Sequence, residues 1–238
     1  MSAPIVTAAV VLDVEGTLGP ASQVRGRLYD YARPRLGPWI EEHAGDPEVR
    51  EALRQTRELA GLADTATPGE LARTLRDWQD RDVKQPPLKT LQGLIWQRGY
   101  DDGELVSRLF RDVAPALRRW HRAGLRLAIY SSGSVQAQLA FLRHTEDGDL
   151  SPLVSGYFDT VTAGPKQLPD SYRAIAAGLG QPAPALLFLS DAPAELSAAE
   201  AAGWRAVAVV RPGEPFAGAD FGARHRVGSF DELRLELP

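Results

Sequence analysis

The sequence predicts an α/β fold in which a Rossmann-like parallel sheet carries an inserted helical cap domain. Short apolar runs alternate with segments of helical periodicity, which is typical of βαβ units. The runs Ile5–Leu12 and Leu125–Tyr130 are separated by residues 13–124, whereas a crossover between parallel strands needs only about a dozen residues. We therefore expect residues 1–20 and 112–238 to form the core, and residues 21–111 to form the cap.

Each core element after residue 112 follows from its own pattern. The helices have apolar residues three or four positions apart, and the strands are short apolar runs bounded by turn residues. The expected elements are, in order, a helix at 114–121, a strand at 125–130, a helix at 135–143, a strand at 186–189, a helix at 194–202 and a strand at 206–210. This alternation indicates parallel strands joined by helices.

The insert is expected to be helical. The stretch Thr67-Pro68-Gly69-Glu70 is typical of a helix start with Thr67 as the N-cap. Lys89, Gln92 and Trp96 are spaced three and four positions apart, so they share one face of a later helix. These three side chains either face a substrate, or Trp96 belongs to the core of the cap and Lys89 is solvated.

Composition excludes several functional classes. The chain has 238 residues, of which 44% are hydrophobic and 24% charged, as in ordinary globular enzymes. A formal net charge of −4 repels a phosphate backbone, so we expect no nucleic-acid partner. The absence of cysteine excludes disulfides and thiolate zinc sites and fits a reducing compartment. With neither a signal sequence nor a membrane-spanning apolar stretch in view, a cytoplasmic monomer is the default expectation.

Two carboxylates follow the first apolar run. Asp13 and Glu15 stand one residue apart after Ile5–Leu12, and Gly16 lets the chain turn away. Because side chains alternate along a strand, both can point into one crevice at the end of the strand, where open α/β sheets bind ligands. Buried carboxylates need a counter-ion, and a hard cation such as Mg²⁺ prefers oxygen ligands. The alternative is a polar turn in which Asp13 caps a local group.

Hydroxyl groups follow the next apolar run. Leu125–Tyr130 ends in Ser131-Ser132-Gly133-Ser134, and a helical pattern begins at once. A strand, a hydroxyl-rich turn and a helix N-terminus form a phosphate-binding arrangement, because free amides and the helix dipole meet the anion. The alternative is an ordinary N-cap by Ser134.

Two further polar residues follow later strands. Lys166 lies in a loop, where a single lysine is usually a solvated surface charge. Asp191 follows the apolar run Ala185–Leu189, and Glu195 comes four residues later. In a parallel sheet the ends of these strands meet at one edge, which would gather Asp13, Glu15, the serines, Lys166 and Asp191.

The order Asp-x-Glu, Ser, Lys, Asp resembles that of the haloacid dehalogenase-like phosphohydrolases. This resemblance implies that Asp13 attacks phosphorus and that Glu15 protonates the leaving group. It also implies that Mg²⁺ is bound by Asp13, Asp191 and the backbone carbonyl of Glu15. The residues that it implies for phosphate binding are Ser131, Ser132 and Lys166.

A narrower resemblance covers most of the chain: it is similar to the enolase-phosphatases (acireductone synthases) of methionine salvage, in which Glu replaces the second Asp of the first motif. It implies a Mg²⁺-dependent enzyme that converts 2,3-diketo-5-methylthiopentyl-1-phosphate to the acireductone, by enolisation and then phosphate hydrolysis through an aspartyl-phosphate. The matching stretches lie at residues 13–17, 31–33, 91–96, 99–100, 112–113, 130–135, 148–150, 156–160 and 211–213.

Two departures from that family lie close to the expected catalytic positions. Leu18 and Gly19 stand where the family usually has threonines, and Leu168 stands where it tends to have glutamate. A phosphatase of the same family acting on another small phosphomonoester therefore remains an alternative, as does a non-catalytic binding protein with the same fold. The full set of catalytic residue types argues against the binding protein. Arg211, in the last matching stretch, either contacts an acid or substrate, or starts a turn.

Overall fold

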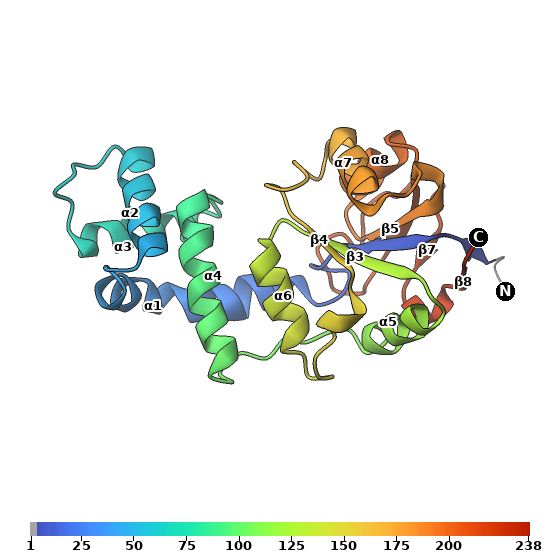
Figure 1. Ribbon diagram of the computed structural model, residues 1–238, viewed down its shortest axis with the longest axis horizontal. Helices are drawn as coiled ribbons and strands as arrows, with labels where there is room; N and C mark the ends of the chain where they lie inside the picture. The colour runs from blue at the N-terminus through green and yellow to red at the C-terminus, as the bar shows by residue number, and fades with distance from the viewer. Residues whose placement is uncertain (1–3) are drawn as a thin grey trace. The chain divides into compact units, whose positions relative to one another are not determined.

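A six-stranded parallel sheet forms the centre of the core in the computed structural model, which describes residues 4–238 except the side chains of Val24 and Arg25 (Figure 1). In spatial order its strands are β4 (Gly156–Phe158), β3 (Arg126–Tyr130), β2 (Ala9–Leu12), β5 (Leu186–Ser190), β6 (Arg205–Val209) and β7 (Arg226–Val227). The chain starts at β2, adds β3 and β4 on one side, and then returns to add β5 on the other. Strand order therefore reverses between β2 and β5, which is where open α/β sheets bind ligands. The predicted fold class is confirmed.

Helices cover both faces of this sheet. One face packs against α5 (Val113–Arg122) and α6 (Val135–Arg143), and the other against α7 (Pro169–Leu179) and α8 (Pro193–Ala201) (Figure 1). Right-handed crossovers produce this arrangement, because the two directions of strand addition place their helices on opposite faces. Among the described residues, no helix is both long and apolar enough to cross a membrane.

The apolar run Ile5–Leu12 is not one strand, which corrects the sequence-based expectation. It divides into β1 (Ile5–Val6), which pairs with β8 (Leu235–Glu236) in a separate two-stranded sheet, and the central strand β2. Thr7 makes the division, because its buried hydroxyl donates to backbone carbonyl oxygens of the core 2.9 Å away. All four residues of β2 are fully buried, as a strand covered on both faces requires.

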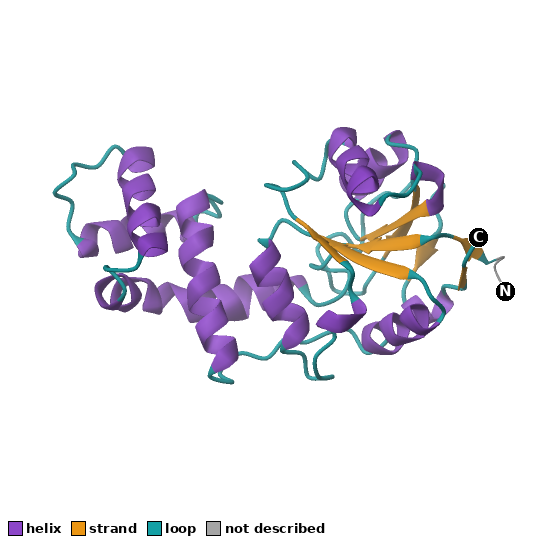
Figure 2. Cartoon of the chain, viewed as in Figure 1, coloured by secondary structure: helices purple, strands orange, loops and turns teal. Residues whose placement is uncertain are grey.

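The second compact unit, Ser22–Leu105, contains only helices and loops among its described residues (Figure 2). Its hydrophobic core is its own, and residues 106–111 belong to the other unit, so the insert ends six residues before the expected boundary at 111. Phe110 illustrates why, since its amide donates to the Leu18 carbonyl 2.9 Å away. The helical elements are a π-helix (Gln23–Leu28), α1 (Tyr29–Glu42), α2 (Pro47–Ala60), α3 (Pro68–Asp80) and α4 (Pro86–Asp101).

Inside this unit the helix start at Thr67 is confirmed. Thr67 and Glu70 form a reciprocal capping box, in which each side chain accepts a hydrogen bond from the backbone amide of the other. Gln92 and Trp96 are bonded within the unit: Gln92 donates to Gln79 Oε1 at 3.0 Å, and the Trp96 indole donates to the Leu28 carbonyl at 2.8 Å. Both side chains therefore have a structural role here, as the core alternative for Trp96 requires.

Among the described residues, three short 3-10 helices complete the core. They lie in connections between the elements described above, at η2 (Ser151–Leu153), η3 (Ala183–Ala185) and η4 (Phe230–Glu232).

Candidate active site

The strand register brings three of the predicted site residues to one edge of the sheet. Leu12 lies opposite Ile129 on β3 and Leu189 on β5. Asp13, which follows Leu12, therefore lies beside the ends of both neighbouring strands, close to the segments that begin at Ser131 and Asp191. These positions flank the point where the strand order reverses.

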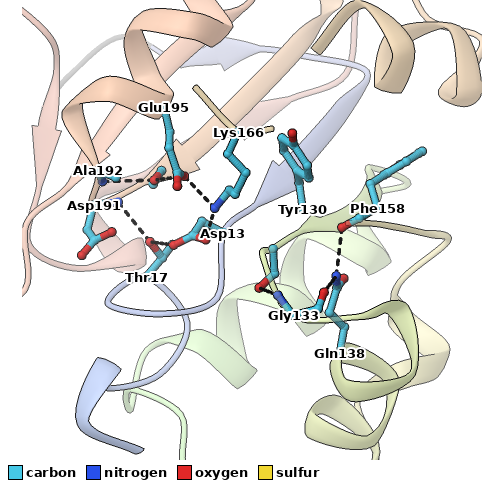
Figure 3. A network of polar contacts seen from close by, with 12 residues as sticks. Asp13, Thr17, Tyr130, Gly133, Gln138, Phe158, Lys166, Asp191, Ala192 and Glu195 are labelled. Atoms are coloured by element: carbon cyan, nitrogen blue, oxygen red, sulfur yellow. Dashed lines mark hydrogen bonds and ion pairs between the residues drawn. The ribbon is translucent and has the colours of Figure 1, made fainter. Parts of the chain in front are cut away.

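Lys166 is buried between two carboxylates, so the solvated-surface alternative for this residue is wrong. Its Nζ lies 2.5 Å from Asp13 Oδ1 and 2.6 Å from Glu195 Oε2 (Figure 3). Burial alone lowers the pKa of Lys166, but the charges of Asp13 and Glu195 raise it more, so the net shift is upward. The ammonium is therefore a fixed positive charge beside Asp13.

Glu195 was visible in the sequence but was not assigned to the site. It lies in the first turn of α8, where its Oε2 also accepts a hydrogen bond from Ser190 Oγ at 3.0 Å. The Ser190 hydroxyl in turn accepts from the amide of Ala192 at 3.1 Å. The signal that could have found Glu195 is its spacing of four residues from Asp191 at a helix start, which places both carboxylates at the same strand end.

Thr17 is a second residue that the sequence did not single out. Its hydroxyl donates to Asp13 Oδ2 at 3.1 Å and accepts from the Asp191 amide at 3.1 Å (Figure 3). Together with Lys166, which contacts Oδ1, Thr17 fixes both oxygens of the Asp13 carboxylate. Glu15 lies in the same turn and is only partly buried, whereas Asp13 is 5% exposed.

The acidic residues exceed the basic ones in this cluster. Asp13, Asp191 and Glu195 supply three buried carboxylates, and Lys166 supplies one ammonium. Burial, and then the charges of Asp13 and Glu195, raise the pKa of Asp191 to about 8. Burial likewise raises the pKa of Glu195 to about 7, against the opposing charge of Lys166. The site therefore favours additional positive charge.

The donor set suits Mg²⁺. This ion is usually held by one or two carboxylates together with water and substrate oxygens, rather than by a cage made of protein alone. In the described part of the chain no group of three or more His, Cys, Asp or Glu side chains is placed to hold a metal ion, so water and substrate oxygens would have to complete the shell of Mg²⁺. Gly16 has a φ of 72°, and a Cβ there would lie 2.1 Å from Asp191 Oδ2. Only glycine leaves room for the Asp191 carboxylate beside the Asp13 turn.

The turn Ser131–Ser134 lies at the N-terminus of α6, as the sequence predicted. Ser134 is the N-cap, because its Oγ accepts from the Ala137 amide at 3.3 Å, so the N-cap alternative for this residue is confirmed. Ser131 is 5% exposed and its Oγ accepts from the Gly133 amide at 3.2 Å, while Ser132 is partly buried. The arrangement still offers an anion the positive end of a helix dipole.

Gln138 and Asp159 attach this turn to the segment that follows β4. Gln138 Nε2 donates to the Gly133 carbonyl at 2.8 Å and to the Phe158 carbonyl at 2.9 Å (Figure 3). The buried carboxylate of Asp159 accepts from the amides of Val135, Val161 and Thr162 at 3.1, 2.9 and 2.8 Å. The turn and the chain leading to Lys166 are thereby held together.

Asp159→Asn is expected to lower the free energy of unfolding by about 1–3 kcal/mol, because the side-chain amide cannot accept every amide hydrogen now bonded. Burial raises the pKa of Asp159, but the hydrogen bonds from Thr162, Val135 and Val161 lower it more, so its net pKa lies below the ordinary value. A depressed carboxyl pKa contributes stability above about pH 4, which is lost as pH falls through the folded-state pKa. Urea unfolding of wild type and variant at several pH values checks this. A difference that stays constant down to pH 2 would contradict it.

The structure explains why leucine and glycine stand at positions 18 and 19, where the family usually has threonines. The Leu18 side chain is fully buried in the core between the sheet and α5, so it does not line a pocket. A Cβ at Gly19 would lie 2.6 Å from the Arg108 carbonyl oxygen. Leu168, by contrast, is 51% exposed directly before α7.

Gly19→Thr is expected to destabilise the core by about 1–3 kcal/mol, because the Arg108 backbone must move to admit the side chain. The matched control is Gly218→Thr, since a Cβ at Gly218 meets nothing within 4 Å. The midpoint of urea unfolding should fall for the first variant and stay near wild type for the second. Equal midpoints for the two variants would show that the segment at Arg108 adjusts freely.

Comparison with known proteins shows the family of the chain. Residues 7–203 match the family model of haloacid dehalogenase-like hydrolases. The chain is 55% identical over 238 residues to the enolase-phosphatase E1 of Saccharopolyspora erythraea, covering 100% of this chain and 99% of that protein. It is 53% identical over 227 residues to the enolase-phosphatase E1 of Streptomyces avermitilis, covering 95% of each.

Solved structures show the same relationship. The UTR4 protein of Saccharomyces cerevisiae is similar with a TM-score of 0.81 and 31% identity, covering 95% of this chain and 100% of that one. CbbY of Rhodobacter sphaeroides, at 21% identity and a TM-score of 0.58, shares the fold. Both resemblances stated from the sequence are confirmed. The chain therefore belongs to the haloacid dehalogenase-like hydrolases and, within them, to the enolase-phosphatase E1 family.

Proposed function

We propose that the protein is a Mg²⁺-dependent enolase-phosphatase that converts 2,3-diketo-5-methylthiopentyl-1-phosphate to the acireductone of methionine salvage. The two relatives described above are both named enolase-phosphatase E1, and this chain aligns with nearly their whole length. The observation that carries the chemistry is the buried Asp13 carboxylate, whose two oxygens are held by Lys166 and Thr17 beside Asp191.

Asp13 is the proposed nucleophile. One of its oxygens forms the bond to phosphorus while the bond to the departing substrate oxygen breaks, which gives an aspartyl-phosphate. The contacts with Lys166 and Thr17 restrict the carboxylate before substrate arrives, so little orientation is left to acquire during the reaction. Asp13, Asp191 and the Glu15 carbonyl oxygen would hold Mg²⁺, which would supply positive charge to stabilise the phosphoryl oxygens.

Glu15 is the proposed general acid and base. It is more exposed than Asp13, so its carboxyl can meet a substrate that enters from solvent. It donates a proton to the departing oxygen and then accepts one from the water that hydrolyses the aspartyl-phosphate. In the preceding enolisation we propose that the same carboxylate removes the proton from carbon.

The phosphate group is proposed to bind between the Ser131–Ser134 turn and Lys166. Ser131 and Ser132 precede the N-terminus of α6, whose dipole favours an anion, and Lys166 adds a full positive charge. Asp159 and Gln138 hold the Ser131–Ser134 turn next to the segment that leads to Lys166.

We further propose that the enzyme acts as a cytoplasmic monomer on a small phosphorylated substrate. The cysteine-free composition is compatible with a reducing compartment.

The test is phosphate release with and without Mg²⁺ from the diketone phosphate, beside a panel of small phosphomonoesters, with the enol followed in the ultraviolet. Enol formation and phosphate release on the diketone, both lost on chelation, support the proposal. Turnover of a different phosphate while the diketone stays inert would assign the chain to another substrate and revive the specificity question at Leu168. Failure of every substrate would favour a non-catalytic binding protein.

Glu15→Ala is expected to slow both enolisation and phosphate release, each by about 10²–10⁴-fold, which is the usual contribution of a positioned acid or base. The two steps are separated by following the enol in the ultraviolet and phosphate by a coupled assay. Retained enolisation in this variant would remove the proposed role of Glu15 at carbon.

A further inference from the structure

A buried arginine lies behind the site without a role in the chemistry described so far. Arg211 follows β6 and is 4% exposed. Its NH1 lies 2.8 Å from Asp112 Oδ2 and donates to the Gly228 carbonyl at 2.9 Å. Its NH2 donates to the Thr17 carbonyl at 3.3 Å. The contact with Asp112 confirms that Arg211 pairs with an acid, and the Glu214 amide donates to the Arg211 carbonyl at 3.2 Å, so the alternative that Arg211 starts a turn is confirmed as well.

The guanidinium is held in one orientation from several sides. Its Cζ lies 4.6 Å from the centroid of the Phe110 ring and 5.0 Å from that of Phe230. Asp112 is fixed in turn, because its Oδ2 accepts from the Phe230 amide at 2.6 Å. A planar group with several donors, stacked and paired in this way, defines the position of whatever it contacts.

What Arg211 contacts is the residue that orients the nucleophile. The Thr17 carbonyl accepts from Arg211, and the Thr17 hydroxyl bonds Asp13 Oδ2 and the Asp191 amide. Glu214, three residues after Arg211, contacts the chain that leads away from Thr17, because its Oε2 accepts from the Ala21 amide at 2.8 Å. Thr17 therefore connects the buried ion pair to the carboxylate of Asp13.

We propose that Arg211, held by Asp112, is a positioning residue that fixes Thr17 and, through Thr17, the orientation of the Asp13 carboxylate. This inference rests on the proposed function, in which Asp13 attacks phosphorus. Arg211 acts behind the nucleophile and has no contact with the residues proposed to bind phosphate, Ser131, Ser132 and Lys166, among the interactions of the described chain. Its loss should therefore affect the chemical step more than substrate binding.

The first experiment compares kcat and KM for wild type, Arg211→Lys and Arg211→Met. Misplacement of a reacting group by about 1 Å can lower a rate by about 10²-fold, so Arg211→Met should lower kcat by about that factor and change KM little. Arg211→Lys, which keeps the charge but loses the planar fork, should recover part of kcat. A variant whose KM rises while kcat stays at the wild-type value would overturn the proposal.

Loss of folding is controlled with a second variant, Arg211→Met combined with Asp112→Asn. This pair leaves no unpaired buried charge, and an Asn carbonyl can still accept from the Phe230 amide, so thermal stability should return toward wild type. Positioning predicts that kcat stays low after stability is recovered, whereas a merely structural role predicts that kcat recovers with it. Arg224→Met is the matched control, because it removes another ion pair of the same unit, with Glu200, in which the arginine side chain is 20% exposed.

The route through Thr17 is tested by a double-mutant cycle. Thr17→Val removes the hydroxyl that contacts Asp13, so adding Arg211→Lys should lower kcat little further. Effects on kcat that multiply independently would show that Arg211 does not act through Thr17.

A failure of the proposed function is distinguishable from a failure of this inference. If the wild type releases phosphate from none of the substrates, the orientation of Asp13 is followed instead with Mg²⁺ and beryllofluoride, a phosphoryl mimic that bonds to an aspartate oxygen. Binding detected by fluorine NMR should weaken by about 10-fold or more in Arg211→Met, in line with a lost positioning contact. Unchanged binding in that variant would overturn the inference.

Discussion

Asp13→Asn is expected to abolish phosphate release, lowering kcat by a factor on the order of 10⁴ or more, as removal of a covalent nucleophile does in other enzymes. The amide oxygen is neutral and cannot form the aspartyl-phosphate. The fold should remain, because the amide keeps the shape of the carboxyl group and its oxygen can still accept from Lys166 or Thr17. Removing one of three buried carboxylates also reduces the excess of negative charge in the cluster.

The measurement is single-turnover phosphate release, with thermal unfolding of the same sample to show that the variant is folded. Asp149→Asn is the matched control, because Asp149 is an exposed aspartate of the same unit. Phosphatase activity that survives Asp13→Asn at more than a trace would show that another group attacks phosphorus. Loss of activity in both variants would point to an effect on the fold.

The sequence was sufficient for those parts of the site that follow strand ends. Ala9–Leu12 and Leu186–Ser190 are apolar over their whole length, so their polar successors, Asp13 and Asp191, marked the edge of the sheet directly. Parallel pairing then required that these ends meet. Strand β3 and the core helices were predictable for the same reason, since each has its own periodicity.

Other parts of the site depend on pairs that lie far apart in the chain. Lys166 had the pattern of a surface lysine, and only the fold shows that Glu195 and Asp13 enclose it. The pair Arg211 and Asp112 is likewise brought together by the arrangement of β6 and α5. Local periodicity carries no information on such contacts, so residue type and spacing could not predict them.

The division of Ile5–Leu12 shows a different limit. Every residue of that run except Thr7 and the two alanines is strongly apolar, and nothing in the pattern marks a change of partner strand. The change occurs because Thr7 bonds backbone carbonyls with its hydroxyl, while Val6 pairs with Glu236 near the C-terminus. Which strand partner a segment takes is a tertiary property, so the periodicity predicted the central strand but not its length.

Lys166→Met is expected to cost both activity and stability. Removing a charge that stabilises the transferred group should lower kcat by about 10²–10³-fold. At neutral pH the free energy of unfolding should fall by about 3–5 kcal/mol, the usual result of removing one partner from a buried ion pair. Asp13 and Glu195 would then be buried without the ammonium that now lies 2.5 and 2.6 Å from them.

The loss of stability should depend on pH in a defined direction. Burial already raises the pKa of Glu195 to about 7 in the wild type, and removing Lys166 takes away the charge that opposes this shift. A carboxyl whose folded-state pKa is raised stabilises the protein at low pH and loses that contribution as pH rises from the unfolded value, about 4.3, through the folded value. The difference between wild type and variant should therefore be largest above pH 7 and shrink toward pH 5.

Urea unfolding from pH 5 to pH 8 tests this, with Lys84→Met as the matched control because Lys84 is exposed. A difference in unfolding free energy that is independent of pH would mean that the methionine side chain destabilises the protein by poor packing, because packing does not depend on protonation. A variant as stable as wild type at every pH, yet inactive, would mean that the two carboxylates share a proton and need no counter-ion. Lys166 would then serve phosphate binding alone. Protonation of Glu195, whose pKa is raised, would be enough to reduce the free-energy cost of burying the acids.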